Sequence, residues 1–123
     1  MIVGIGTDMI EIDRVIKACE KEAFLTRFFT GEEIRLIRRD RKKSADNFAV
    51  KESVVKLFGT GFSGIMPADV EVLRDEYGKP YVNLYGAAKE MADRLGISRI
   101  HVSITNTRKY ASAFAVGESN EEG

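Results

Sequence analysis

Two glycines interrupt the apolar run at the amino terminus of this 123-residue chain. Residues 2–8 are rich in isoleucine and valine, which favours a short β-strand that stops at Asp8. Glycine weakens a strand unless another backbone or a ligand must approach it closely. Gly4 and Gly6 therefore either weaken this strand or mark a place where another backbone or a ligand lies close to it.

A helical pattern follows the strand from about Glu11. Apolar residues recur there at spacings of three and four, namely Ile12, Val15, Ile16 and Cys19. Basic residues fall on another face of the same predicted helix, namely Arg14, Lys17 and Lys21. The only cysteine of the chain belongs to the apolar set, so we interpret it as a core residue.

Two further helices are predicted in the middle of the chain. Thr30 and Glu33 have the spacing of a capping box and should open a short helix. Ser44 is the expected N-cap of a longer helix, which runs through a dense set of apolar residues to Phe58. Gly59 then ends that helix in the usual glycine position.

The second half of the chain is rich in strand signals. Residues 70–84 predict a hairpin, and a helix over 87–95 separates it from strands at 99–105 and 110–116. The sequence therefore predicts one α+β domain over residues 1–117, with an antiparallel sheet packed against helices. Residues 118–123 are expected to form an acidic, flexible tail.

Composition excludes several classes of protein. Nineteen Lys and Arg residues balance nineteen Asp and Glu residues, so the chain is not a polycation that coats nucleic acid. One cysteine allows neither an internal disulfide nor a cysteine-rich zinc site. No apolar run is long enough to span a membrane, and the amino terminus lacks the pattern of a secretory signal. We therefore expect a cytoplasmic protein that binds neither membrane nor nucleic acid.

Asp8, Glu52 and Lys56 are the first candidates for chemistry. Asp8 at a strand exit suits a binding site, although it would equally serve as the N-cap of the next helix. Glu52 and Lys56 are four residues apart, which is the spacing of a simple surface ion pair. At the margin of the core, however, the carboxylate could hold a hard cation and the lysine a phosphate.

Other polar features carry weaker signals. Residues 59–64 form a glycine-rich loop that could cradle phosphate oxygens, but the loop lacks the Walker pattern. His101 and Ser103 share the polar face of a strand, and a lone histidine is more often structural than catalytic. Residues 35–43 hold six basic residues and one acidic residue, which suits a solvated surface, a phosphate or an acidic protein. A binding module for an acidic protein and a nucleic-acid binder are therefore the alternatives to an enzyme.

Taken together and in this order, these pieces resemble the holo-[acyl-carrier-protein] synthases, the small single-domain type of 4′-phosphopantetheinyl transferase. The matching stretches are residues 4–8 (Gly-Ile-Gly-Thr-Asp), Arg14, Phe29-Thr30 with Glu33, residues 48–53 (Phe-Ala-Val-Lys-Glu-Ser) with Lys56, residues 58–61 (Phe-Gly-Thr-Gly), residues 78–81 (Gly-Lys-Pro-Tyr), residues 101–105 (His-Val-Ser-Ile-Thr) and Tyr110-Ala. They cover nearly the whole chain, and the combination of the first stretch with Lys-Glu-x-x-x-Lys is specific.

The resemblance implies transfer of 4′-phosphopantetheine from coenzyme A to a serine of apo acyl carrier protein, with release of adenosine 3′,5′-bisphosphate, in fatty acid biosynthesis. It implies that Asp8 and Glu52 bind Mg²⁺, or Mn²⁺ in its place, and that these two residues and Lys56 are catalytic. It implies docking of the carrier protein on Arg14, Lys17 and Lys21, and a homotrimer with active sites between subunits. The coenzyme A contacts that it implies are Lys51, Ser53, Lys56, Gly59, Gly61, His101, Ser103 and Asn106.

One position departs from the family pattern. Family members commonly have a histidine near the nucleotide where this chain has Asn106. Asparagine still donates a hydrogen bond but carries no charge. We expect a changed affinity for coenzyme A with the chemistry retained.

Overall fold

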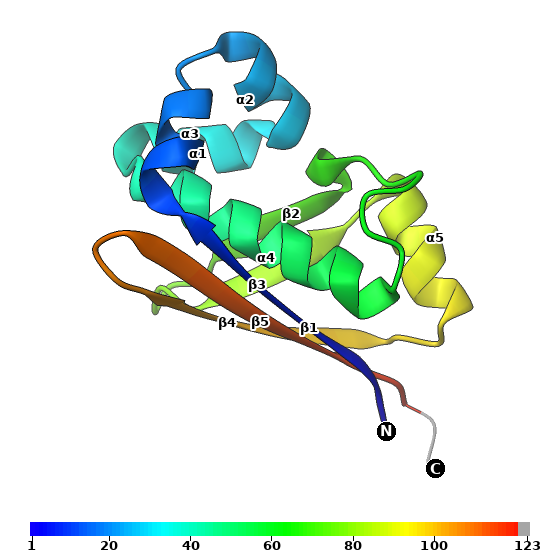
Figure 1. Cartoon of the computed structure of the whole chain (residues 1–123). Coiled ribbons are helices and arrows are strands. Elements are labelled where there is room, and N and C mark those ends of the chain that lie inside the picture. The colour runs from blue at the N-terminus through cyan, green and yellow to red at the C-terminus, as the bar shows by residue number, and fades with distance from the viewer. Residues whose placement is uncertain (121–123) are drawn as a thin grey trace.

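Helix α4 (Lys42–Phe58) lies across one face of a three-stranded antiparallel sheet (Figure 1). The computed structural model describes residues 1–120 and orders the sheet as β1 (Ile2–Glu11), β5 (Tyr110–Glu118) and β4 (Arg99–Asn106). The other elements are α1 (Ile12–Ala18), α2 (Glu22–Phe28), α3 (Gly31–Arg39), a 3-10 turn (Pro67–Asp69), β2 (Val70–Arg74), β3 (Pro80–Leu84) and α5 (Gly86–Arg94). The α+β class with antiparallel sheets is thus confirmed.

The second sheet is the predicted hairpin. Strands β2 and β3 pair antiparallel on the other side of α4, so that the helix lies between the two sheets (Figure 1). Helices α1, α2 and α3 gather at one end of α4, and α5 lies near its other end. Because α4 is covered on nearly all sides, Val50, Val54 and Val55 on it are fully buried. None of the helices within residues 1–120 has the length and apolar character needed to cross a bilayer.

Helix α4 lies close to the glycines of β1, so of the two interpretations of Gly4 and Gly6 the close approach of another backbone holds. A Cβ atom added to Gly6 would lie 1.9 Å from the carbonyl oxygen of Ser53, and one added to Gly4 would lie 3.1 Å from that of Leu57. Strand β5 likewise presents small residues to the helix, namely Ala111, Ala113, Ala115 and Gly117. The helix backbone therefore lies almost directly on the strands.

Several predicted boundaries are wrong. Strand β1 does not stop at Asp8 but continues to Glu11, since Asp8 pairs with Ala113 in the ladder with β5. Asp8 is therefore not an N-cap, because α1 begins only at Ile12. Lys21 lies beyond α1, at the start of α2. Ser44 lies inside α4 and donates its hydroxyl to the carbonyl of Arg41, because the helix has already begun at Lys42.

Other local predictions are confirmed. Thr30 and Glu33 form the full capping box at the start of α3. Gly59 ends α4 in the left-handed conformation, with φ of 79°. At the carboxyl end, β5 includes Glu118, and the amide of Ser119 donates to the carbonyl of Met1. The predicted tail thus begins within ordered structure, and its residues 121–123 lie outside the described part of the chain.

The contact at Gly6 predicts a large effect from a single methyl group. Replacing Gly6 by Ala should force α4 away from β1 and reduce the free energy of unfolding by about 1–3 kcal/mol or more, measured in urea. Gly31→Ala is the control, because an added Cβ there meets nothing within 4 Å. Equal stabilities of the two variants would contradict the close approach of helix and strand.

Candidate functional site

Asp8 and Lys56 meet where β1 passes α4. The ammonium nitrogen Nζ of Lys56 lies 2.8 Å from Oδ1 of Asp8 and 3.2 Å from the carbonyl oxygen of Thr7. The side chain of Asp8 is 13% exposed and that of Lys56 is 52% exposed. Oδ2 of Asp8 is buried and has no hydrogen-bond partner. One oxygen of this carboxylate is therefore paired with Lys56, and the other is left for a ligand.

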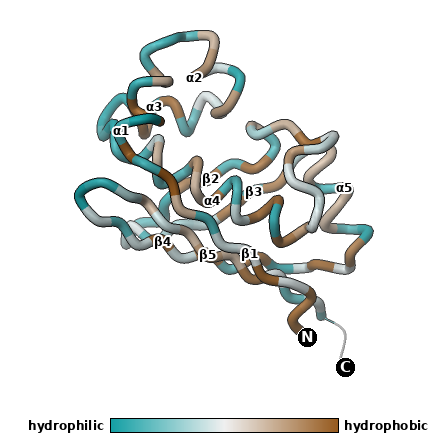
Figure 2. Tube along the Cα trace, in the orientation of Figure 1, coloured by the Kyte–Doolittle hydropathy of each residue, from teal (hydrophilic) through white to brown (hydrophobic). Residues whose placement is uncertain are grey.

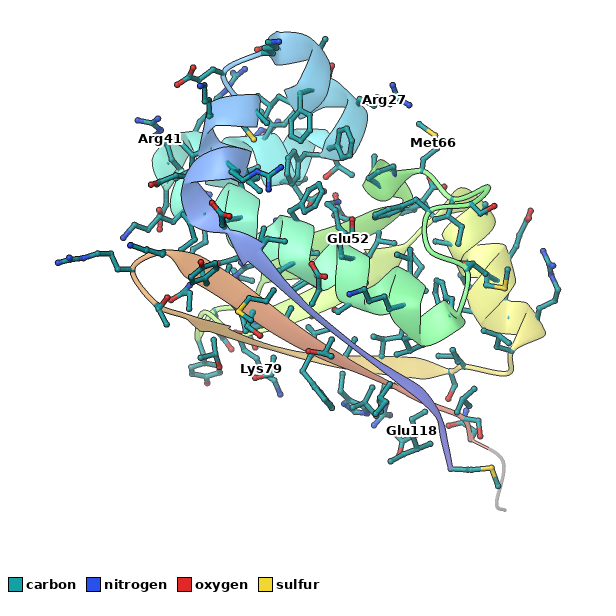
Figure 3. All side chains as sticks on the ribbon, in the orientation of Figure 1. Arg27, Arg41, Glu52, Met66, Lys79 and Glu118 are labelled. Carbon is teal, nitrogen blue, oxygen red and sulfur yellow. The ribbon has the colours of Figure 1, made fainter. Side chains whose placement is uncertain are left out.

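Glu52 completes this group from the same helix. It lies midway along α4, one turn before Lys56 (Figure 3), and its carboxylate makes no hydrogen bond to residues 1–120. Burial raises the pKa of Glu52, and the charge of Asp8 raises it further, while Lys56 lowers it. The two carboxylates are thus close enough to repel each other. A cation that both could bind would relieve that repulsion.

The donor set fits a hard divalent cation. Carboxylate oxygens are preferred ligands of Mg²⁺, and the unpartnered Oδ2 of Asp8 is an acceptor that lacks a donor. Within residues 1–120 no cluster of three or more His, Cys, Asp or Glu residues is suited to a metal. A cation held here would therefore keep several coordination positions for water or phosphate oxygens, as Mg²⁺ commonly does.

Lys51 lies in the core, in contrast to its neighbour Glu52. The Lys51 ammonium is 2.8 Å from Oε1 of Glu33 and donates also to the carbonyls of Pro67 and Val70. Both side chains of the Lys51–Glu33 pair are 0% exposed. Glu33 accepts further bonds, from Asn47 and from the backbone amides of Thr30 and Val72. Burial lowers the pKa of Lys51, and attraction to Glu33 opposes that shift.

This burial corrects two of the predicted coenzyme A contacts. The amine of Lys51 is occupied by protein oxygens, and Ser53 is fully buried with its hydroxyl donating to the carbonyl of Val50. Neither side chain reaches the surface, so neither contacts a ligand bound there. The sequence did not indicate that Lys51 is buried, because its acidic partner Glu33 lies 18 residues away and belongs to another helix.

The remaining predicted coenzyme A contacts do not form one cluster within a single chain. Gly59 and Gly61 are exposed in the loop after α4, just beyond Lys56. His101 and Ser103 are exposed on the face of the sheet opposite α4, and Nε2 of His101 lies 3.1 Å from Glu118. Asn106 faces the other way and donates to the carboxylate of Asp46.

The three basic residues predicted for partner binding lie together. Arg14, Lys17 and Lys21 line an open hollow of about 520 Å³, with Ala18 and Phe24 as its apolar part. A second hollow of about 410 Å³ shares Arg14, Ala18 and Phe24 with the first. It extends to Met9 and Phe48, and these residues are sequence neighbours of the carboxylates, since Met9 follows Asp8 and Phe48 precedes Glu52 by one turn. We call the two hollows together the basic groove.

Aromatic residues that line the basic groove, Phe24 and Phe48, were not predicted from the sequence. Phe24 stacks on Phe28 with ring centroids 4.2 Å apart, and it lies 6.5 Å from Phe48. The spacing of Phe24 and Phe28 was the available signal, because residues four apart share one face of a helix. Nothing in the sequence indicated that Phe48 of α4 would join them.

Comparison with known proteins gives consistent matches. Residues 4–115 match the family described as the 4′-phosphopantetheinyl transferase superfamily. The chain is 60% identical to a holo-[acyl-carrier-protein] synthase of Lachnoclostridium phytofermentans over 118 residues, which are 96% of this chain and 97% of the relative. Its fold matches an acyl carrier protein synthase of Plasmodium yoelii with ADP bound, with a TM-score of 0.87, 31% identity and 98% of each chain covered. A holo-(acyl-carrier-protein) synthase of Bacillus anthracis in complex with CoA (3′,5′-ADP) matches with a TM-score of 0.80 and 32% identity, over 98% of this chain and 99% of that one.

The two lysines of α4 allow a matched test of their different surroundings. Lys51→Met should lower the free energy of unfolding by about 3–5 kcal/mol, because it leaves Glu33 buried without its counter-charge. Lys56→Met should cost less than about 1 kcal/mol, since an exposed ion pair contributes little. Urea unfolding of the two variants makes the comparison. Similar small losses would contradict a structural role of Lys51.

Proposed function

The chain belongs to the 4′-phosphopantetheinyl transferase superfamily, and we propose that it transfers the 4′-phosphopantetheine group of coenzyme A to a serine of apo acyl carrier protein. The chain is a phosphopantetheinyl transferase, as are its curated relatives. The observation that carries the finer proposal is the meeting of Asp8, Glu52 and Lys56 where β1 passes α4. The second product is adenosine 3′,5′-bisphosphate, and the modified carrier serves fatty acid biosynthesis.

In this proposal Asp8 and Glu52 hold Mg²⁺. Support comes from the unpartnered Oδ2 of Asp8 and from the mutual repulsion of the two carboxylates. When bound, the cation neutralises charge on the pyrophosphate of coenzyme A, which favours attack on phosphorus. Mn²⁺ suits the same oxygen donors.

The protein side chains supply the proton transfer and a further positive charge. The serine hydroxyl oxygen of the carrier forms a bond to the β-phosphorus of coenzyme A, and the bond from that phosphorus to the bridging oxygen of the bisphosphate breaks. Glu52, or a water molecule beside it, takes the proton of the hydroxyl. The ammonium of Lys56 lies beside the carboxylates and stabilises the leaving bisphosphate.

The carrier protein docks on the basic groove. Arg14, Lys17 and Lys21 complement an acidic partner, and the groove extends from them to Met9 beside Asp8. A serine presented from that side would approach the carboxylates.

The rate of carrier modification at low carrier concentration should fall as salt is added, because screening weakens the attraction between the basic groove and an acidic carrier protein.

We also propose that the chain forms a homotrimer with active sites between subunits. The sheet face opposite α4 exposes Ile5 and Phe114, which are 59% and 46% exposed, and the amino-terminal end of β1 is strongly hydrophobic (Figure 2). Exposed apolar faces of this kind mark protein–protein interfaces. His101 and Ser103 lie on the same face. A neighbouring subunit could therefore bring them to coenzyme A bound beside Lys56 and the Gly59–Gly61 loop.

Phe114→Lys should dissociate the trimer, because it places three charges in an apolar interface. Sedimentation equilibrium should then report the mass of one chain instead of three. Tyr77→Lys is the matched control, since Tyr77 is an exposed aromatic residue in the hairpin turn, 86% exposed, and its replacement should leave the trimer intact. A wild-type protein that sediments as a single chain would contradict the proposal.

The proposed reaction is tested by the mass of the carrier protein. Incubation with coenzyme A, apo acyl carrier protein and Mg²⁺ should add the mass of phosphopantetheine, and a chelator should abolish the gain. Asp8→Asn should lower kcat/KM at least about a hundredfold, because it removes a metal ligand. Asp93→Asn is the control, since Asp93 also pairs with a lysine but lies on α5.

The same assay separates the alternatives. No mass gain on any carrier, with retained binding of an acidic protein, would indicate a binding module. A gain that persists in both Asp8→Asn and Glu52→Gln at near-normal rate would contradict the proposed metal site while retaining the transferase.

A further inference from the structure

The ion pair of Lys56 and Asp8 occupies an atom that the proposed metal site needs. Nζ of Lys56 is 2.8 Å from Oδ1 of Asp8, and the carbonyl of Thr7 gives the ammonium a second acceptor at 3.2 Å. No other cationic side chain lies within ion-pair distance of Asp8 among residues 1–120. Lys56 therefore neutralises Asp8 in the protein without metal.

A lysine in this position opposes a divalent cation in two ways. It competes for Oδ1 of Asp8, and its positive charge repels a cation bound between Asp8 and Glu52. It does not block the site permanently, because its side chain is 52% exposed on a flexible stem. Oδ2 of Asp8 has no partner while Lys56 pairs with Oδ1, so a cation has a first acceptor before Lys56 leaves.

We propose that Lys56 is an internal counter-ion that holds Asp8 until a divalent cation displaces it, and that the displaced ammonium then binds the substrate pyrophosphate. The second half of this inference rests on the proposed function, because it takes coenzyme A as the phosphate donor. Lys56 then makes binding of metal and substrate cooperative. An anionic substrate that draws Lys56 away from Asp8 increases the affinity of the site for the metal. By linkage, the bound metal increases the affinity for the substrate by the same factor.

This arrangement also explains why the lysine lies one turn after Glu52. On α4, residues four apart share one face, so Lys56 lies on the side of Glu52, three residues before the loop that begins at Gly59. Glu52 makes no hydrogen bond to residues 1–120, so it stays free while Lys56 pairs with Asp8. One lysine thus serves two positions, at Asp8 before the metal binds and at the phosphates afterwards.

The test is the affinity for Mn²⁺ alone, read by electron paramagnetic resonance at mildly alkaline pH. Lys56→Met keeps the length of the side chain and removes its charge. It should bind Mn²⁺ about fivefold more tightly than the wild type in the absence of coenzyme A, since an exposed ion pair of ordinary strength is lost as a competitor. Lys89→Met is the matched control, because Lys89 forms an exposed pair with Asp93 at 2.6 Å on α5. It should leave Mn²⁺ affinity unchanged.

The second arm repeats the titration with coenzyme A present. Coenzyme A should tighten Mn²⁺ binding by a larger factor in the wild type than in Lys56→Met, because only the wild type has a lysine to transfer. Unchanged or weaker Mn²⁺ binding by Lys56→Met without coenzyme A would overturn the counter-ion role. An equal coenzyme A effect in both proteins would overturn the transfer of the lysine to phosphate.

These outcomes are separate from failure of the proposed function. A wild type that modifies the carrier protein, together with unchanged Mn²⁺ affinity of Lys56→Met, would refute the inference and leave the function intact. A wild type that never modifies a carrier, together with tighter Mn²⁺ binding by Lys56→Met, would support the counter-ion and refute the function.

Discussion

The close contact between α4 and β1 determines the position of the site. Because Gly6 has no side chain, the carbonyl of Ser53 lies where a Cβ atom would be, and the helix rests directly on the strand. Asp8 is two residues further along β1 and points to the same face, so it meets the helix as well. Glu52 directly precedes Ser53 on α4, and Lys56 follows Ser53 by three residues. Both side chains therefore lie near Asp8, and the ammonium of Lys56 pairs with its carboxylate. A backbone approach thus places two carboxylates and a lysine within one small volume.

The orientation of α4 about its own axis is fixed by a buried ion pair. Lys51 and Glu52 are adjacent in sequence but about 100° apart around the helix. The first reaches Glu33 and two carbonyls inside the protein, while the second lies at the margin of the core near Asp8. A rotation of the helix that exposed Lys51 would also turn Glu52 away from β1. The buried pair and the open site therefore depend on the same helix orientation.

The sequence was sufficient for features with a local physical cause. The Thr30–Glu33 capping box and the Gly59 C-cap predicted helix ends, and turn residues predicted the hairpin. The glycines of β1 left two interpretations open, a weakened strand or a close neighbour. The predicted end of β1 was wrong because it depends on a tertiary contact. The predicted start of α4 was wrong because the helix begins before Ser44, where the amide of Lys42 donates to the carboxylate of Asp40. Pairing with β5 carries β1 past Asp8, and no local rule gives that register.

The burial of Lys51 could not be predicted either, because the oxygens that accept from its ammonium belong to α3 and to the segment around the start of β2. Both Asp8 and Lys56 were candidates from the sequence. Their contact could not be predicted, because it joins two residues that only the folded chain brings together.

In the proposed site, Asp8 and Glu52 hold one divalent cation across the contact of β1 and α4. The most direct measurement is a crystal structure of the protein grown with Mn²⁺, with anomalous diffraction used to locate the metal. We expect an anomalous peak bound by carboxylate oxygens of both residues, with Lys56 displaced from Asp8. A metal bound elsewhere, or full occupancy of the Lys56–Asp8 pair at saturating Mn²⁺, would contradict it.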